Sequence, residues 1–200
     1  MRIQKAISTI LHPIVIPTLG VFLYFIFVPN TILRKQQLLL LGLVFAATYA
    51  IPLLLLIILR AIGLIQNFQL NTIKERRFPV IFMIFLFYIL GKIISGNVLL
   101  IDLGFLFYGT SISLFCIYFL FMFRLKSSLH LVSMGNAISF FLIISMAHSI
   151  NLLPVVMVLI ILSGLLASSR LSLKAHTPTE LVLGFFLGFI SQFILYFFTL

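Results

Sequence analysis

The chain has 200 residues, of which 63% are hydrophobic and only 8% are charged. Ordinary soluble domains carry about 25% charged residues, so this composition excludes a water-soluble globular protein. The formal net charge is +10, but the basic residues sit in short stretches between apolar runs. This pattern favours anionic lipid and phosphate groups as partners and argues against nucleic acid. Cys116 is the only cysteine, so no disulfide can form within the chain.

Seven apolar segments follow one another along the chain, and each is predicted to be a helix because lipid offers no partner for backbone polar groups. We expect an all-α, polytopic bundle of about six to seven transmembrane helices that forms one integral-membrane domain over residues 1–200. The first segment carries two prolines in ILHPIVIPTLG, so it is expected to be bent or partly re-entrant. The predicted segments are 13–29, 37–59, 79–95, 99–123, 129–149, 152–168 and 178–199.

Alternating helix directions would bring most of the charged residues to one membrane face. On that face we expect the loops 60–78, 124–128 and 169–177, and on the other face 30–36, 96–98 and 150–151. Ten of the 13 lysine and arginine residues then lie on the first face. The exceptions are Arg34, Lys35 and Lys92. Such convergence is what an active site at the membrane surface requires.

The stretch SSRLSLKAHTPTE contains the residues with the clearest chemistry. His176 and Glu180 are four residues apart and share one helix face if the last helix begins near Thr177 and Pro178. A carboxylate beside an imidazole fixes its tautomer and makes the other ring nitrogen a better nucleophile. Arg170 and Lys174 add cations that suit phosphate oxygens. Together these groups suit in-line attack on phosphorus.

Two further clusters lie on the same predicted face. His130 stands at a helix start with Lys126 four residues before it, and an imidazole there could protonate a leaving-group oxygen. The motif KERRFP supplies Lys74, Arg76 and Arg77 just before another helix.

The acidic residues are too few and too dispersed to bind a catalytic magnesium ion or metal pair, and no Cys/His spacing indicates zinc. They are Glu75, Asp102 and Glu180. We therefore expect phosphoryl chemistry without a metal or other cofactor.

These residues resemble the motifs of the type 2 phosphatidic-acid phosphatase / vanadium haloperoxidase superfamily. Its third signature, Ser-Arg-x5-His-x3-Asp, is matched from Ser169 to Glu180 with Glu in place of Asp. The second, Pro-Ser-Gly-His, is matched at Ser128 and His130 only. The first, Lys-x6-Arg-Pro, is represented by KERRFP in residue types and order but not in spacing. The resemblance covers about residues 74–190. The sequence also resembles an uncharacterised bacterial subgroup, common in Bacteroidetes, with a Lys-x-Ser-x-His second motif.

The resemblance implies a role for each residue. His176 would be the nucleophile that forms a phosphohistidine, Glu180 would orient it, and His130 would be the general acid. The implied phosphate-binding residues are Arg170, Lys126, Arg76, Arg77 and Lys74. The glycines that often follow the third signature occur as Gly184 and Gly188, which permit close helix packing either within the chain or between chains of a homo- or hetero-oligomer.

The predicted function is a membrane lipid phosphatase or phosphotransferase acting on a lipid phosphate or pyrophosphate. The alternative is a catalytically inactive relative that binds anionic lipid or serves as a subunit of a membrane complex. A transporter ranks lower, because no chain of ionisable residues crosses the predicted midplane. The expected location is the bacterial cytoplasmic (inner) membrane. Its sidedness stays open, because the basic residues favour a cytoplasmic site and the resemblance favours an external one.

Overall fold

The computed structural model describes residues 2–199 except 67, 69 and 71, and it confirms an all-α bundle. Among these residues, six helices are long and apolar enough to cross a membrane. One of the six is continuous from Arg34 to Ala61, where a π-helical turn joins two α-helices. The elements are α1 (Arg2–Ile10), α2 (Ile16–Phe27), α3 (Arg34–Phe45), η1 (Ala46–Ala50), α4 (Ile51–Ala61), α5 (Ile73–Ser95), η2 (Val98–Leu100), α6 (Ile101–Met122), α7 (Leu129–Ala147), α8 (Leu153–Ser172) and α9 (Pro178–Thr199).

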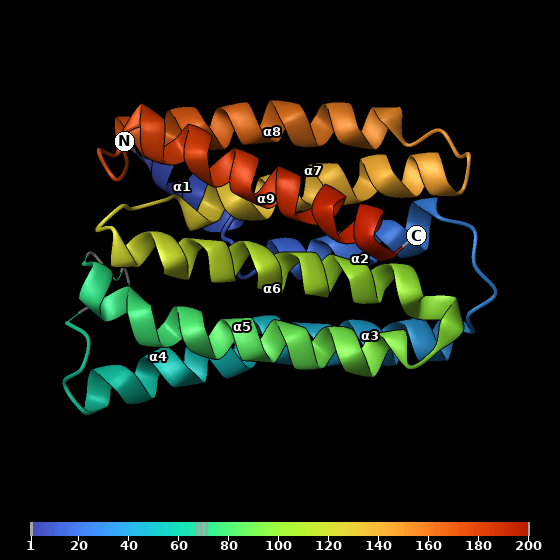
Figure 1. Ribbon diagram of the computed structural model, residues 1–200, viewed down its shortest axis with the longest axis horizontal. Helices are drawn as coiled ribbons and strands as arrows, with labels where there is room; N and C mark the ends of the chain where they lie inside the picture. The colour runs from blue at the N-terminus through green and yellow to red at the C-terminus, as the bar shows by residue number, and fades with distance from the viewer. Residues whose placement is uncertain (1, 67, 69, 71, 200) are drawn as a thin grey trace.

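The long helices run side by side and alternate in direction, as predicted (Figure 1). The connections α4–α5, α6–α7 and α8–α9 lie at one end of the bundle, at the left of Figure 1, together with the start of α1. The connections α2–α3, α5–α6 and α7–α8 lie at the other end. The three motif-bearing regions of the sequence therefore share one end, which we call the motif end.

Two helices extend further than their apolar stretches predicted. The helix expected at 79–95 begins at Ile73, so KERR forms its first turns instead of preceding it. The helix expected at 152–168 continues to Ser172, so Arg170 lies on a helix and not in a loop. Hydropathy marks only the lipid-immersed part of a helix, whereas long basic side chains at its end can reach the membrane surface without ending it.

The N-terminal region is broken into two short helices, which fits the expected bend. An unpredicted helix, α1, ends at Ile10, and the chain unwinds around His12 and Pro13 before α2 begins at Ile16. With 12 residues, α2 spans only about 18 Å at 1.5 Å per residue. This length is well short of the roughly 30 Å hydrocarbon core, so the break places His12 within the bundle, below the motif end.

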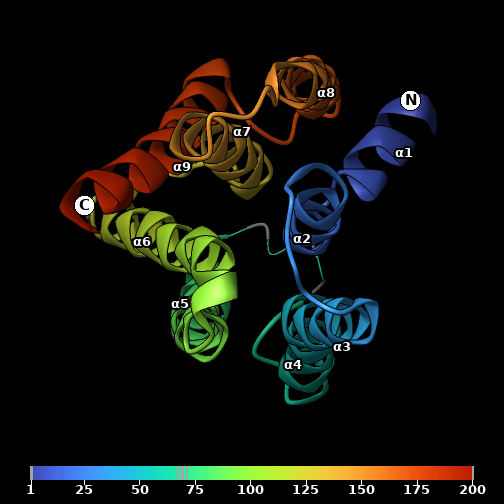
Figure 2. The same cartoon turned by 90° about the vertical axis from the view of Figure 1, so that its right-hand side faces the viewer.

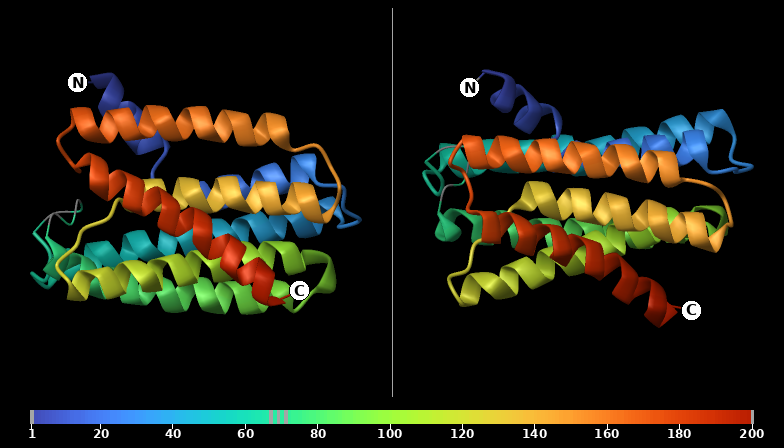
Figure 3. Two further views of the ribbon diagram at one scale, coloured as in Figure 1. Left: turned by 45° about the horizontal axis from the view of Figure 1, so that its top comes forward. Right: turned by 90° about the horizontal axis from the view of Figure 1, so that it is seen from above.

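Helix α7 is the central element of the bundle, and its neighbours are α2, α6, α8 and α9 (Figure 2). Helix α9 crosses α7 and α6 obliquely (Figure 3), and glycines allow the close approach. A Cβ atom added at Gly184 would lie 2.7 Å from the Ser128 carbonyl oxygen, and one at Gly188 would collide with the Val132 carbonyl. These two glycines therefore permit close packing against α7 of the same chain, and an oligomer through α9 stays a prediction.

Candidate active site at the motif end

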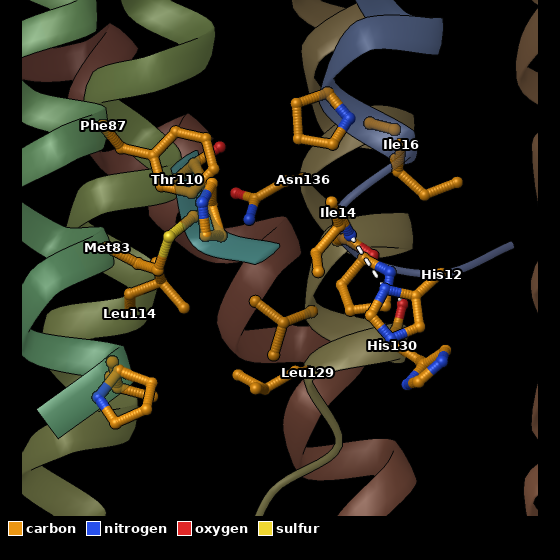
Figure 4. Close-up of a pocket in the computed structure, with 18 of the residues that line it drawn as sticks. His12, Ile14, Ile16, Met83, Phe87, Thr110, Leu114, Leu129, His130 and Asn136 are labelled. Carbon is orange, nitrogen blue, oxygen red and sulfur yellow. Dashed lines mark hydrogen bonds between the residues drawn. The ribbon is translucent and has the colours of Figure 1, made fainter. Parts of the chain in front are cut away.

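A cavity of about 190 Å³ lies among α2, α4, α5, α6 and α7, and predicted site residues from three separate motifs line it. His130 comes from α7, Arg76 from α5, Arg170 from α8 and His176 from the loop before α9. His12, from the break between α1 and α2, also lines the cavity and lies beside His130 in Figure 4. The folded chain thus brings together three histidines and two arginines that span most of the sequence.

His176 is held by the start of α9. Thr177 caps this helix: its hydroxyl accepts from the Glu180 amide at 3.3 Å, and its own amide donates to the Glu180 carboxylate at 3.3 Å. The same carboxylate oxygen lies 2.7 Å from His176 Nδ1. Because an ionised carboxylate only accepts, the ring proton is on Nδ1. The lone pair of His176 is therefore on Nε2.

The surroundings of His176 favour its neutral form. Burial is the largest effect, and it lowers the pKa of the imidazole below its ordinary value of 6.5. The hydrogen bond that His176 donates to Glu180 opposes this change, whereas the charges of Arg76 and Arg170 lower the pKa further. A histidine that is neutral at pH 7 has the free electron pair that a nucleophile needs.

Arg76 is positioned by the start of α5, where a second Thr-x-x-Glu capping box, formed by Thr72 and Glu75, begins the helix. The Arg76 side chain is buried, and its Nε donates to the Leu70 carbonyl at 2.7 Å. Its Nη1 lies 3.5 Å from the Ser127 carbonyl oxygen. These backbone contacts hold the guanidinium at the cavity without neutralising its charge.

Arg170 reaches across to the N-terminal helix, where its Nη1 donates to the Ser8 hydroxyl at 2.8 Å. Its Nε is buried and has no hydrogen-bond partner among the described residues. A buried guanidinium N–H without a partner is costly, and an anion bound in the cavity would remove that cost. Arg76 and Arg170 make this region cationic, and the carboxylates of Glu180 and Glu75 offset part of the charge at Arg76.

His130 is buried, and its Nε2 lies 3.2 Å from the Ser8 carbonyl oxygen. Because a carbonyl accepts only, this nitrogen carries a proton, and Nδ1 is the nitrogen left for other chemistry. Ser8 thus contacts two site residues, since its hydroxyl holds Arg170 and its carbonyl holds His130. A backbone hydrogen bond from Ser128 to the Glu180 carbonyl, at 3.1 Å, also ties the start of α7 to that of α9.

His12 is a site residue that the sequence patterns did not single out. Its ring packs edge-on against His130, with 5.1 Å between the ring centroids. The Ile14 amide lies 3.4 Å from its Nδ1, which places the ring proton on Nε2 (Figure 4). Burial, followed by the charge of Arg170, lowers the pKa of His12. The sequence signal that could have indicated His12 is its position directly before a proline at the start of an apolar segment. A proline there can break the helix, and the break can direct a polar side chain into the bundle.

The other predicted phosphate-binding residues share the motif end but do not line the cavity. Lys74 and Arg77 are exposed, and Lys126 is half-buried in the connection before α7. On a helix of 3.6 residues per turn, Arg77 is rotated by about 100° and Lys74 by about 200° from Arg76, so both point elsewhere. Their predicted contact with a phosphate stays a prediction.

The two remaining acidic residues have other contacts. Glu75 accepts from the Thr72 and Gln66 amides and thereby caps α5. Asp102 lies on α6 at the opposite end of the bundle, where it accepts from the Tyr24 hydroxyl at 3.0 Å and lies 2.8 Å from His148 Nε2. Glu180 is therefore the acidic residue that contacts a histidine of the cavity.

The fold and this cavity define an integral membrane helix bundle with a buried, cationic, histidine-containing site at one end. The chain matches no protein-family model, no curated protein and no solved structure. Its function is therefore argued from the site itself.

Proposed function

We propose that the protein is a membrane phosphatase or phosphotransferase that cleaves a lipid phosphate or pyrophosphate through a phosphohistidine. The observation that carries this proposal is the His176–Glu180 pair, whose histidine lines one cavity together with Arg76, Arg170 and His130. Each group then has a place in the reaction. The resemblance of residues 169–180 to the third phosphatase signature supports the same assignment.

In the first step, the lone pair on His176 Nε2 attacks phosphorus and the bond to the leaving-group oxygen breaks. Glu180 stabilises the positive charge that develops on the ring. The leaving oxygen takes a proton from a second histidine that lines the cavity. His130 has this role, because the negative charge of the bound phosphate would favour a second proton on its Nδ1.

In the second step, water attacks the phosphohistidine and gives its proton to His130 Nδ1, the N–P bond breaks, and inorganic phosphate leaves with both histidines restored. An alcohol in place of water would make the reaction a phosphotransfer. Arg76 and Arg170 would bind the equatorial oxygens of the transferring group, where negative charge is spread in the transition state.

The membrane setting favours a substrate that is itself a lipid. The cavity opens among helices that are otherwise apolar and lipid-facing, so a phosphate carried on a hydrocarbon chain would arrive at the correct depth. Phosphatidic acid, phosphatidylglycerol phosphate, lipid A phosphates and undecaprenyl pyrophosphate all have this character. A bacterial cytoplasmic membrane is the proposed location.

The proposal is tested by phosphate release from these lipids by the purified protein in nanodiscs, with a chelator present. We expect turnover in the wild type and a loss of at least about 10³-fold in His176→Ala, because the nucleophile is removed. Unchanged turnover in His176→Ala would contradict the mechanism.

The alternative, an inactive relative that binds anionic lipid, predicts a different pair of results. Phosphate lipids would bind the wild type, and the Arg170→Gln variant would bind them more weakly, but neither protein would release phosphate.

A further inference from the structure

The cavity continues from the site residues into the middle of the bundle. On α7 its lining extends from His130 to Phe140, and on α5 from Arg76 to Phe87. Ten residues of helix at 1.5 Å per residue correspond to about 15 Å of depth. This depth is about half of the roughly 30 Å hydrocarbon core of a membrane.

The inner part of the cavity is apolar. Met83, Phe87 and Leu114 line one wall, and Ile14 and Ile16 line the facing wall (Figure 4). In the end-on view, the helices that supply these walls surround the centre of the bundle (Figure 2).

The few polar groups of this inner part make their hydrogen bonds within the protein. The Ser133 hydroxyl donates to the His130 carbonyl at 2.8 Å, and the Thr110 hydroxyl donates to the Leu106 carbonyl at 2.8 Å. The Asn136 side-chain amide donates to the Ser113 hydroxyl at 2.9 Å. Since these groups are already satisfied, the inner part offers an apolar surface to an occupant.

The cavity therefore has two chemically different ends. Arg76, Arg170 and His176 make one end cationic and hydrogen-bonding, whereas Met83, Phe87 and their neighbours make the other end hydrophobic. The complementary molecule is an amphiphile with an anionic head and a hydrocarbon tail. At roughly 10–15 Å³ per water-sized group, the whole cavity of about 190 Å³ holds about 13 to 19 such groups, head region included, which corresponds to one chain and not two.

We propose that the inner part of the cavity, the tail chamber, binds the single hydrocarbon chain of a phosphate or pyrophosphate monoester inside the bundle. We define the tail chamber by Gly20, Met83, Phe87, Ala137 and Phe140. This inference rests on the proposed function, because it places the phosphate beside His176. It narrows the substrate to single-chain lipids, either saturated or isoprenoid, and disfavours diacyl lipids.

The test uses a dodecyl phosphonate that carries a photoactivatable diazirine at mid-chain, with the full-length protein in nanodiscs. The carbon–phosphorus bond resists hydrolysis, so labelling reports on binding and needs no turnover. We expect labels on Met83, Phe87 or Phe140, and competition by dodecyl or prenyl phosphate but not by a diacyl phosphate. Labels confined to the lipid-facing Phe85 and Ile93 of α5, or equal competition by the diacyl lipid, would overturn the inference.

A matched pair of glycine variants tests the location further. A Cβ atom added at Gly20 would lie 3.6 Å from Leu106 Cδ2, within the chamber, whereas one at Gly42 meets nothing within 4 Å. Gly20→Leu should reduce chamber labelling about tenfold, corresponding to roughly 1.4 kcal/mol, and Gly42→Leu should label like the wild type. Equal labelling of both variants would contradict the chamber.

Failure of this inference can be told apart from failure of the proposed function. Chamber labelling without any phosphate release would contradict the proposed enzymatic function and support the tail chamber as a binding site. Phosphate release without chamber labelling would support the proposed enzymatic function and contradict the tail chamber. The hydrocarbon tail of the substrate would then lie in the bilayer.

Discussion

Glu180 has two roles that depend on one carboxylate oxygen. It accepts from the Thr177 amide at 3.3 Å and from His176 Nδ1 at 2.7 Å, so the residue that caps α9 also fixes the tautomer of the proposed nucleophile. Burial lowers the pKa of His176, while Glu180 raises it. The balance of these effects sets the pH range in which Nε2 holds a free electron pair.

Replacing Glu180 by glutamine removes the negative charge of the side chain and keeps its size and shape. We expect turnover in Glu180→Gln to fall about 10²-fold to 10⁴-fold, because the developing imidazolium loses its counter-charge. The wild-type activity should be steady near neutral pH and decline as the pH falls below 6.5, through the lowered pKa of His176. Without Glu180, which raises that pKa, the acid-side decline should move to lower pH.

The profile of kcat/KM against pH measures this change, with the exposed Lys35→Gln at the far end of the bundle as the control. The control matters because the substrate phosphate also titrates in this range. An acid limb that coincides in all three proteins would contradict the role given to Glu180.

At the scale of elements, the position of α9 against α7 decides how close the motifs lie. Gly184 and Gly188 face the backbone of α7 near Ser128 and Val132, and this approach sets the start of α9, with His176, beside the start of α7, with His130. Any side chain at these glycines would move the two helices apart.

Gly188→Ala should therefore destabilise the fold by about 1–3 kcal/mol, the usual cost of overpacking. Gly164 of α8 is the matched control, because a Cβ atom there meets nothing within 4 Å. Gly164→Ala should leave stability unchanged or slightly raised, since alanine favours helix by about 1 kcal/mol over glycine. Thermal unfolding in detergent compares the two, and equal midpoints would refute the packing argument.

The helices show which structural features could be predicted from the sequence and which could not. Long apolar runs predicted the spanning helices, because lipid demands complete backbone pairing. They did not predict that Arg76 and Arg170 lie within helices, since charged helix ends look like loops in a hydropathy pattern. They could not predict α1 or the inward position of His12 either, because both depend on tertiary contacts with α7 and α8.

At the scale of the whole molecule, most of the basic residues lie at one end of the bundle and three lie at the other. Arg170, Lys174 and the KERR motif lie at the motif end, and Arg34, Lys35 and Lys92 lie at the other (Figure 1). The motif and spacing of residues 169–180 predicted His176 and Glu180 as a pair because both lie close in sequence. That Arg76 and His130 would lie at the same end of the bundle as this pair was predicted from the alternating directions of the helices.

This arrangement predicts which positions react together from one side of the membrane. In a Cys116→Ser background, Lys174→Cys and Arg124→Cys should react with the same face-restricted maleimide. Lys35→Cys should react only from the opposite face. Labelling in oriented vesicles measures this sidedness, and reaction of positions 174 and 124 from opposite faces would contradict the topology.

The central claim is that His176 carries the phosphoryl group. The most direct measurement is rapid quenching of the wild-type protein with a ³²P-labelled lipid phosphate, followed by mapping of the labelled peptide. The account predicts an acid-labile, alkali-stable phosphate on His176 that forms before phosphate is released and is absent from His176→Ala. Turnover with no labelled histidine, or a label that persists in His176→Ala, would contradict it.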